Sequence, residues 1–283
     1  MATVSNSYDV VGDIAVLRSL SENSSVRTVA AEIMKIRKNV KTVLSQDSKI
    51  AGDFRLRSLS YVTGEDRRIT RYRESSCLFS VDLEKCYFTP RLSYERLRIS
   101  NLVKAGETVV NMFAGIGCFS IIIAKHAKPD LVFSIDINPT AIALMRDNIR
   151  FNSLYGKVIP LLGDAEKIVR RRLQGVADRV LMPLPEKALQ LLPIAISALK
   201  PLGGWIHLYD FQHAAKTEAP IEKTKSIVAE KMSQMGFKFE CTFSRIVRSI
   251  GPNWYQTVID MHVLPFSTNL NSDCGYVSMR EYR

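Results

Sequence analysis

The chain has few residues of the kinds that build metal centres and disulfide frameworks. Its 283 residues include only 5 cysteines and 4 histidines. The cysteines are odd in number, none of them forms a Cys-x-x-Cys pair, and the histidines do not cluster with them. This pattern argues against a zinc site or a disulfide scaffold. We therefore expect a cytoplasmic protein in a reducing environment, without a metal ion.

Long hydrophobic runs are also missing. No apolar stretch approaches the ~20 residues that a membrane-spanning helix needs. The first 25 residues lack the basic segment and apolar core of a secretory signal, so we expect neither a signal nor a membrane partner. Hydrophobic residues make up 46% and charged residues 24% of the chain, which is typical of a globular protein with one large or two modest domains.

Acidic residues are in deficit. The chain has 39 lysines and arginines against 28 acidic residues, a net charge of +11. Such a surplus favours a polyanionic partner, although solubility alone explains it equally well. The basic residues crowd into four places rather than a detachable tail: 35–41, 55–73, 91–98 and 170–172. This placement favours nucleic acid.

The second part of the chain alternates strand and helix patterns. The expected strands are 108–112, 131–137, 158–162, 176–182 and 205–211. Expected helices lie between and after them, at 139–152, 164–173, 187–199 and 221–235. This alternation predicts a mostly parallel α/β sheet with helices on both faces, closed by an antiparallel edge from strands at 237–247 and 255–263.

The first eighty residues predict a small α+β domain. The expected elements are two short strands or one bulged strand within 8–17, a helix across 24–43, and strands at 54–62, 70–74 and 77–88. A helix at 93–103 then leads into the alternating region. We expect domains at 1–80 and 81–265, followed by a C-terminal tail at 266–283.

Residues 107–120 read as a strand, a glycine turn and the start of a helix. Gly115 and Gly117 sit where the chain must turn without a side chain. Such a turn places backbone N–H groups at the carboxyl edge of a sheet, where a nucleotide-like ligand binds. The third glycine of the dinucleotide fingerprint is missing, so the motif alone fits an ordinary strand–turn–helix equally well.

Two aspartates follow the next two strands. Asp136 lies nineteen residues after Gly117, where an acidic residue can hold ribose hydroxyls. Asp164 follows Gly163 at the end of the strand after that, where it can accept the amino group of an adenine. Each aspartate also fits a helix N-cap. Together with the glycine turn they favour an adenosine-containing cofactor without a pyrophosphate, S-adenosylmethionine rather than NAD.

Several segments resemble a known family, the archaeal and eukaryotic tRNA (guanine-N1)-methyltransferases, which act on guanosine 37 beside the anticodon. The resemblance is carried by residues 12–16, 81–96, 110–117, 135–139, 178–185 and 245–252. Its most specific part is Tyr-Phe-x-Pro-Arg-Leu-x-x-Glu-Arg, residues 87–96. The resemblance implies a class I S-adenosylmethionine-dependent methyltransferase fold, Rossmann-like, preceded by a small α+β domain. It also implies tRNA as the partner and a monomer.

The resemblance assigns roles to individual residues. Glu95 matches the base that removes the N1 proton, and Arg55, rather than Arg57, matches the arginine that stabilises O6. The cofactor-binding positions that it implies are Tyr87, Arg96, Phe113, Ala114, Gly115, Gly117, Asp136, Ile137, Asp164 and Met182. The residues alone favour Glu95 as an i,i+3 partner of Arg98, and they fit Arg55 as an exposed strand arginine equally well.

The sequence departs from the family in two places. The family usually carries an asparagine, which contacts the target guanine, where this chain has Pro183. Proline has neither a side-chain amide nor a backbone N–H, so its carbonyl and neighbouring backbone must replace that contact, or the chemistry is altered. The chain also starts almost directly at the motif beginning at Tyr8, so we expect the extra N-terminal domain of many members to be absent.

Two other functions stay open. The related enzyme of wybutosine synthesis shares the fold but transfers the 3-amino-3-carboxypropyl group of the same cofactor. The Leu-Pro that follows Pro183 favours methyl transfer. A methyltransferase of this type can also act on a tricyclic guanosine derivative. The third reading is a non-catalytic RNA-binding relative, for which Pro183 is the best support.

Overall fold

The computed structural model describes residues 8–18 and 26–266 in two compact units. The first unit contains the described residues up to Tyr94, with Gly115–Cys118 and Asn138–Ser153. The second contains Glu95–Ala114, Phe119–Ile137 and the described residues from Leu154 onward. The domain limits expected from the sequence stay predictions, and most of the expected C-terminal tail lies outside the described residues.

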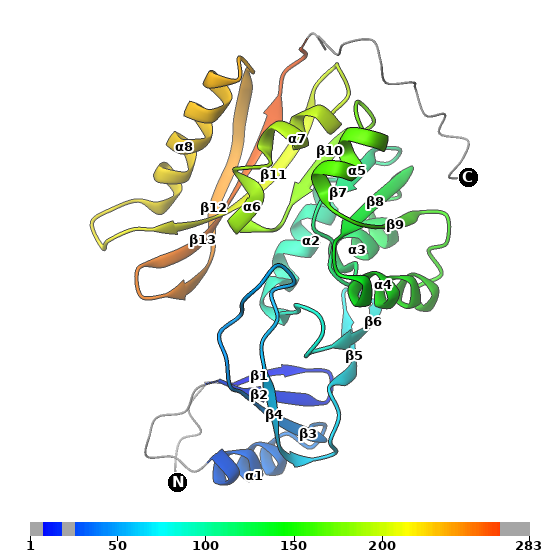
Figure 1. Ribbon diagram of the computed structural model, residues 1–283, viewed down its shortest axis with the longest axis vertical. Coiled ribbons are helices and arrows are strands. Elements are labelled where there is room, and N and C mark those ends of the chain that lie inside the picture. The colour runs from blue at the N-terminus through cyan, green and yellow to red at the C-terminus, as the bar shows by residue number, and fades with distance from the viewer. Residues whose placement is uncertain (1–7, 19–25, 267–283) are drawn as a thin grey trace. The chain divides into compact units, whose positions relative to one another are not determined.

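The first unit is built on a four-stranded sheet in the order β1-β2-β3-β4 (Figure 1). Its strands are β1 (Tyr8–Val11), β2 (Ile14–Leu17), β3 (Thr42–Gln46) and β4 (Leu59–Gly64). Helix α1 (Val26–Ile36) packs on the sheet through the buried side chains of Ala30 and Ile33. Apolar residues one turn apart on α1 therefore give this unit its own small core.

A second strand pair in the first unit is joined to a helix by side-chain amides. The pair is β5 (Ile69–Glu74) and β6 (Cys77–Asp82), and the helix is α4 (Pro139–Phe151). Asn148 on α4 accepts a hydrogen bond from the backbone N–H of Ser80 at 2.6 Å and donates to its carbonyl at 3.2 Å. Asn152 does the same with Leu78, at 2.9 and 2.8 Å. These two amides satisfy backbone groups that β6 would otherwise leave without partners.

The second unit contains a seven-stranded sheet in the order β12-β13-β11-β10-β7-β8-β9. Its strands are β7 (Thr108–Asn111), β8 (Leu131–Asp136), β9 (Val158–Leu162), β10 (Arg179–Met182), β11 (Gly204–His213), β12 (Phe239–Gly251) and β13 (Trp254–Val263). Each pair of neighbours among β11, β10, β7, β8 and β9 is parallel, whereas β13 pairs antiparallel with both β11 and β12. The expected parallel sheet with an antiparallel edge is confirmed.

The two faces of this sheet differ in polarity. One face packs against α5 (Ala165–Arg172), α6 (Pro185–Ala188), α7 (Leu192–Ala198) and α8 (Pro220–Gln234). Its buried side chains are mostly apolar, including Met112, Phe133, Met182 and Leu208, and buried Thr257 on β13 lies 2.8 Å from Thr224 of α8. Because side chains alternate along a strand, the intervening residues form the other face. That face is rich in buried polar groups: Asn111, Ser134, Arg179, His207, Tyr209 and Asp260.

Four expected elements differ from the structure. The strand expected at 77–88 ends at Asp82, because residues 83–85 form a turn. The helix expected across 24–43 ends at Ile36 in the described part, and β3 follows because its residues pair with β2 and β4. The strand expected from residue 54 begins only at Leu59, since residues 52–55 form a turn in which Gly52 and Arg55 have positive φ. The helix expected at 187–199 is split into α6 and α7, because Pro193 has no N–H to continue it.

None of the helices in the described residues combines the length and apolar composition that a membrane crossing requires.

Candidate active site

The glycine turn after β7 has the backbone conformation that its sequence predicts. Gly115 and Gly117 have φ of +56° and +91°, in the region that side chains disfavour. Within the second unit, the N–H of Ala114 donates to the carbonyl of Ile135 at 2.8 Å, which ties the start of the turn to β8. Helix α3 (Cys118–His126) begins directly after Gly117. The turn therefore presents backbone groups at the carboxyl edge of the sheet.

The two aspartates behave differently as helix caps. Asn138, not Asp136, caps α4, since its side chain accepts from the N–H of Thr140 at 2.9 Å. The N-cap interpretation of Asp136 is therefore wrong, and its half-buried carboxylate ends β8. Asp164 is the N-cap of α5, where Oδ1 accepts from the N–H of Lys167 at 3.0 Å. Its second oxygen, Oδ2, takes no part in this cap.

These residues fit an adenosine-containing cofactor. Asp136, Gly163 and Asp164 follow neighbouring strands at one edge of the sheet, and the N–H of Gly163 donates to the carbonyl of Asp136 at 3.0 Å. Gly163 has φ of +147°, so this corner needs a residue without a side chain. The edge offers carboxylates and backbone groups to ribose and adenine, which is the arrangement of a class I S-adenosylmethionine-dependent methyltransferase.

Glu95 is the most unusual carboxylate of the second unit. It lies on α2 (Ser93–Leu102), is 1% exposed, and uses its two oxygens differently. Oε1 accepts from Arg98 Nε at 2.9 Å, from Arg98 Nη2 at 2.5 Å and from Tyr209 Oη at 2.9 Å. Oε2 is buried and has no hydrogen-bond partner among the described residues. The expected i,i+3 pair with Arg98 is therefore real, yet it leaves one oxygen available to a ligand.

Arg98 connects Glu95 to a buried chain of charged and polar groups. Its guanidinium binds both oxygens of Asp260, at 2.5 and 3.1 Å. Asp260 Oδ1 lies 2.6 Å from His207 Nδ1, and His207 Nε2 lies 2.6 Å from Arg179 Nη1. Arg179 in turn makes a bidentate pair with Glu107, at 2.7 and 3.1 Å. The geometry of Glu95 is thus fixed by groups from five separate segments.

The bonding pattern determines the state of His207. A guanidinium only donates, so Nε2 accepts from Arg179 and the proton resides on Nδ1, which donates to Asp260. Burial lowers the pKa of His207, and the nearby Arg179 and Arg98 lower it further against the opposing effect of Asp260. Burial raises the pKa of Asp260, but the bonds from His207 and Arg98 outweigh it and hold this pKa at about 2. His207 is therefore neutral beside an ionised Asp260.

Arg98 and Tyr209, the two side chains that donate hydrogen bonds to Glu95, keep their usual charge states. Burial works against the charge of Arg98, yet its bonds to Asp260 and Glu95 raise its pKa. Burial and the adjacent Glu95 raise the pKa of Tyr209 well above its usual value, so Tyr209 stays a hydrogen-bond donor. Tyr209, His207 and Asp260 are not among the residues expected from the sequence. The one feature of the sequence that marks them is that polar side chains recur two residues apart in otherwise apolar strands, as at 207 and 209 and at 260 and 262.

The arginine expected at O6 lies in the first unit. Arg55 is half-buried in a turn with φ of +55°, so its interpretation as an exposed strand arginine is wrong. Its guanidinium carbon lies 4.3 Å from the ring centroid of Tyr87, a cation–π contact. Arg57 donates from Nη1 to Gln46 Oε1 at 3.1 Å, and burial lowers its pKa. The structure therefore places Arg55 against one of the expected cofactor-binding residues.

The remaining expected residues differ in exposure. Pro183 is half-buried directly after β10, and Met182 before it is fully buried in the apolar core. Arg96 is 3% exposed, Phe113 packs at the edge of the core, and Ala114 is buried. Ile137 is 42% exposed. Their roles at the cofactor stay predictions.

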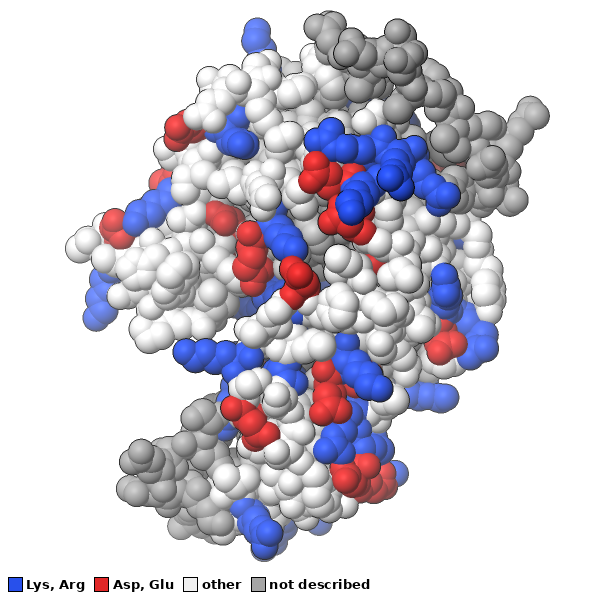
Figure 2. Space-filling model, in the orientation of Figure 1, with Lys and Arg blue, Asp and Glu red and all other residues white. Residues whose placement is uncertain are grey.

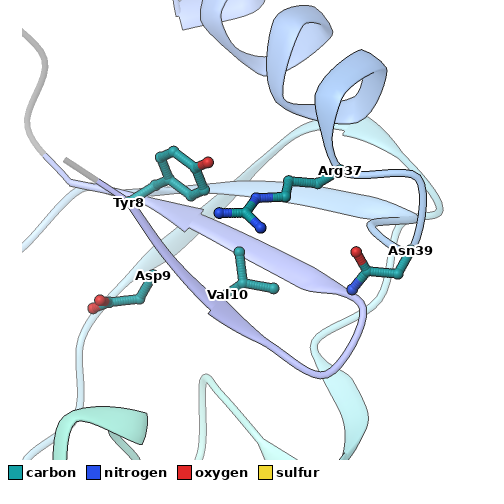
Figure 3. A pocket seen from close by; sticks show the side chains of 5 residues that line it. All are labelled: Tyr8, Asp9, Val10, Arg37 and Asn39. Atoms are coloured by element: carbon teal, nitrogen blue, oxygen red, sulfur yellow. The ribbon is translucent and has the colours of Figure 1, made fainter. Parts of the chain in front are cut away.

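A shallow hollow of the first unit was not expected from the sequence (Figure 3). It has a volume of about 340 Å³ and is lined by Tyr8, Asp9, Val10, Arg37 and Asn39. In Figure 3 the Arg37 side chain extends over the sheet toward the ring of Tyr8. Asp9 is already paired with Arg18 at 2.5 Å and with Arg91 at 2.9 Å. The hollow thus offers an arginine and a phenol but no spare carboxylate.

Comparisons with known proteins agree with this class. The TRM5/TYW2 methyltransferase domain family matches residues 70–235, and the TYW2 N-terminal domain family matches residues 1–67. The Trm5b tRNA (guanine(37)-N(1))-methyltransferase of Pyrococcus abyssi is 37% identical over 91% of this chain and 74% of its own length. Its crystal structure matches with a TM-score of 0.80. This chain belongs to the TRM5/TYW2 methyltransferase family.

Two further relatives differ in activity. Taw21 of Saccharolobus solfataricus, a tRNA 4-demethylwyosine(37)-methyltransferase, is 36% identical over 89% of this chain and 92% of its own length. The structure of TYW2 from Methanocaldococcus jannaschii, solved with S-adenosylmethionine, matches with a TM-score of 0.70 at 26% identity, over 92% of this chain and all of that one. The family is therefore clear, and the reaction has to be argued from the site.

Proposed function

We propose that this protein transfers the methyl group of S-adenosylmethionine to N1 of guanosine 37 in tRNA. The observation that carries the proposal is the asymmetric Glu95 carboxylate, held through Oε1 by three hydrogen bonds, while Oε2 has no partner in the part of the chain that the structure describes. Guanine N1 carries a proton and is a poor nucleophile, so methylation needs a fixed base. Glu95 Oε2 is such a base.

The other residues of the site act on the cofactor and on the developing charge. The glycine turn and Asp136 hold the ribose side of S-adenosylmethionine, and Asp164 Oδ2 accepts the adenine amino group. The sulfonium supplies an electrophilic methyl group. As N1 loses its proton, negative charge grows on O6, and Arg55 donates to that oxygen. Pro183 offers only its carbonyl and neighbouring backbone to the base.

Exposed basic residues support tRNA as the partner. Figure 2 shows lysine and arginine side chains gathered over α5, where Arg170, Arg171 and Arg172 are exposed. Arginine–phosphate contacts release counterions, so tRNA binding weakens steeply with salt. We also propose that the protein works as a cytoplasmic monomer. Gel filtration with light scattering, with and without tRNA, tests the oligomeric state.

A second candidate substrate is 4-demethylwyosine at the same tRNA position. Its support is that Taw21, a tRNA 4-demethylwyosine(37)-methyltransferase, is 36% identical to this chain over 89% of it. Pro183 also supports this substrate. The edge of 4-demethylwyosine differs from that of guanine, so its recognition does not need the asparagine amide that the family usually has at this position. Glu95 would then remove a proton from a ring atom other than N1.

One assay separates the readings. S-adenosylmethionine is labelled either on the methyl or on the carboxyl carbon, and tRNA carries either guanosine or 4-demethylwyosine at position 37. The proposal predicts that methyl label enters the guanosine tRNA. Methyl label entering only the 4-demethylwyosine tRNA supports the second candidate, and carboxyl label entering supports aminocarboxypropyl transfer. No transfer, with retained tRNA binding, contradicts all of them and leaves a binding protein.

A further inference from the structure

A groove of about 910 Å³ lies within the first unit, apart from the residues assigned to the reaction. One wall is a face of the β5–β6 pair, and the other is the turn between β1 and β2 together with Asn39. Val10 and Asn39 also line the hollow of Figure 3, so the two spaces border each other. Neither Arg55 nor Tyr87 lines the groove. It is therefore a candidate for a binding site of its own.

Two arginines occupy the β5 wall of the groove. Arg71 and Arg73 are two residues apart, so their side chains leave the same face of the strand, about 6.7 Å apart at their bases. Both are exposed, and neither has an acidic partner in the part of the chain that the structure describes. The guanidinium carbon of Arg71 lies 5.3 Å from the ring centroid of Phe151 on α4, a cation–π contact that restrains it. The wall thus presents two adjacent positive charges.

The carboxylate that lines the groove does not cancel these charges. Asp13 Oδ2 accepts from Arg67 Nη2 at 2.5 Å, and its Oδ1 accepts from Arg67 Nη1 at 3.0 Å and from Thr70 Oγ1 at 2.6 Å. Asp13 is therefore already paired. At the adjoining hollow, the exposed Arg37 likewise has no acidic partner among the described residues. The lining as a whole is positively charged and attracts an anion.

Close packing on both sides holds the walls in place. Gly12, in the turn between β1 and β2, has φ of +58°, and a Cβ there would lie 2.3 Å from the Arg71 carbonyl oxygen and from Thr70 Oγ1. The backbone of this turn therefore rests directly on β5. Beyond β5, Asn148 of α4 binds both backbone groups of Ser80 on β6. The groove is thus formed before any ligand binds.

A fixed row of arginines in a polar groove is complementary to a strand of phosphates. The guanidinium fork matches phosphate oxygens in a bidentate way. The spacing of Arg71 and Arg73 is close to that of successive phosphates along a nucleic-acid strand. We propose that this groove binds the sugar–phosphate backbone of the substrate tRNA, with Arg71 and Arg73 on neighbouring phosphates. tRNA as the partner is taken from the proposed function, on which this inference rests.

The first test measures tRNA affinity in a double variant, Arg71→Gln with Arg73→Gln. Binding should weaken about tenfold, because each exposed ion pair contributes up to about fivefold. The slope of log affinity against log salt should become shallower by about 1.5, since each phosphate contact contributes about 0.7 to 0.9. The control, Arg27→Gln with Arg146→Gln, removes two exposed arginines of the first unit that do not line the groove. It should keep the wild-type affinity and slope.

A photo-cross-linker in the groove tests its occupancy without removing a charge. p-Benzoylphenylalanine in place of Ile69, which lines the groove and is 53% exposed, should cross-link to bound tRNA. The same group in place of Leu202, which is 81% exposed and outside the groove, should not.

The outcomes separate this inference from the proposed reaction. The inference fails if the double variant binds tRNA with the affinity and salt slope of its control, or if no cross-link forms from position 69 while tRNA is bound. A wild type that binds tRNA in the groove but methylates none of it overturns the reaction and leaves the groove assignment standing. A wild type that binds no tRNA overturns both.

Discussion

His207 and Asp260 lie opposite each other in the antiparallel pair of β11 and β13, with Nδ1 and Oδ1 2.6 Å apart. This contact fixes the histidine tautomer. Asp260 also accepts hydrogen bonds from Arg98 at both of its oxygens. Because Arg98 also holds Glu95, the register of two strands at the edge of the sheet determines the position of the proposed base. The proposed base is thus positioned by residues of the sheet.

The buried, neutral His207 predicts that stability falls below neutral pH. The unfolded chain binds a proton at this histidine near pH 6.5, whereas the folded protein does so only at lower pH because its pKa is lowered. Unfolding therefore takes up a proton in this window, and the free energy of unfolding decreases as pH falls, by at most about 1.4 kcal/mol per unit.

Substitution of His207 by glutamine should remove this part of the pH dependence. The measurement is urea unfolding of the wild type and His207→Gln at pH 7.5, 6 and 5. His126, exposed at the end of α3, provides a control as His126→Gln. A His207→Gln variant with the same loss of stability between pH 7.5 and pH 5 as the wild type would contradict the buried, neutral state.

Tyr209 should affect the reaction without affecting binding. Tyr209→Phe removes one of the three donors on Glu95 Oε1 and leaves the two from Arg98. Loss of one hydrogen bond of about 1 kcal/mol predicts a several-fold slower single-turnover rate. Affinities for tRNA and cofactor should not change, as measured by calorimetry. Tyr155→Phe, at a position 68% exposed, is the control. Equal rates for both variants would show that Tyr209 does not position the base.

Asp164 has two roles that one pair of variants separates. Oδ1 caps α5, and Oδ2 is the proposed acceptor for adenine. Asp164→Ala should lose the cap, at about 1 kcal/mol of stability, together with cofactor affinity. Asp164→Asn keeps a capping oxygen but places an NH₂ group where the second oxygen was. Its stability should be close to that of the wild type while its cofactor affinity falls. Unchanged affinity in both variants would restrict Asp164 to the cap.

Local signals in the sequence account for much of the fold. The alternation of strands and helices, the glycine turn and the antiparallel edge are all encoded by neighbouring residues, and the structure confirms them. Errors arose where a distant partner decides the outcome. Strand β3 forms because β2 and β4 pair with it. The helix at 187–199 was an error of another kind, since Pro193 was present as a local signal.

The site was predictable only in part, for the same reason. Glu95 and Asp136 stand in motifs, so the sequence points to them. Arg98 is a local partner of Glu95, but Tyr209, which also bonds to Glu95, and Asp260, which holds Arg98, come from β11 and β13, more than one hundred residues away, and meet only through strand register. The N-cap of α4 shows that even a local feature can be ambiguous in the sequence. Asn138 and Asp136 are two residues apart, and only the helix geometry decides that the asparagine is the cap.

The most direct test of the account is the single-turnover rate of Glu95→Gln with guanosine-37 tRNA. Glutamine keeps an oxygen for Arg98 and Tyr209 but puts an NH₂ group in place of Oε2, so it cannot accept the N1 proton. General-base catalysis contributes about 10²- to 10⁴-fold, so we expect the rate to fall by at least about 100-fold, with tRNA and cofactor affinities within about threefold. A rate equal to that of the wild type would contradict the assignment of Glu95 as the base.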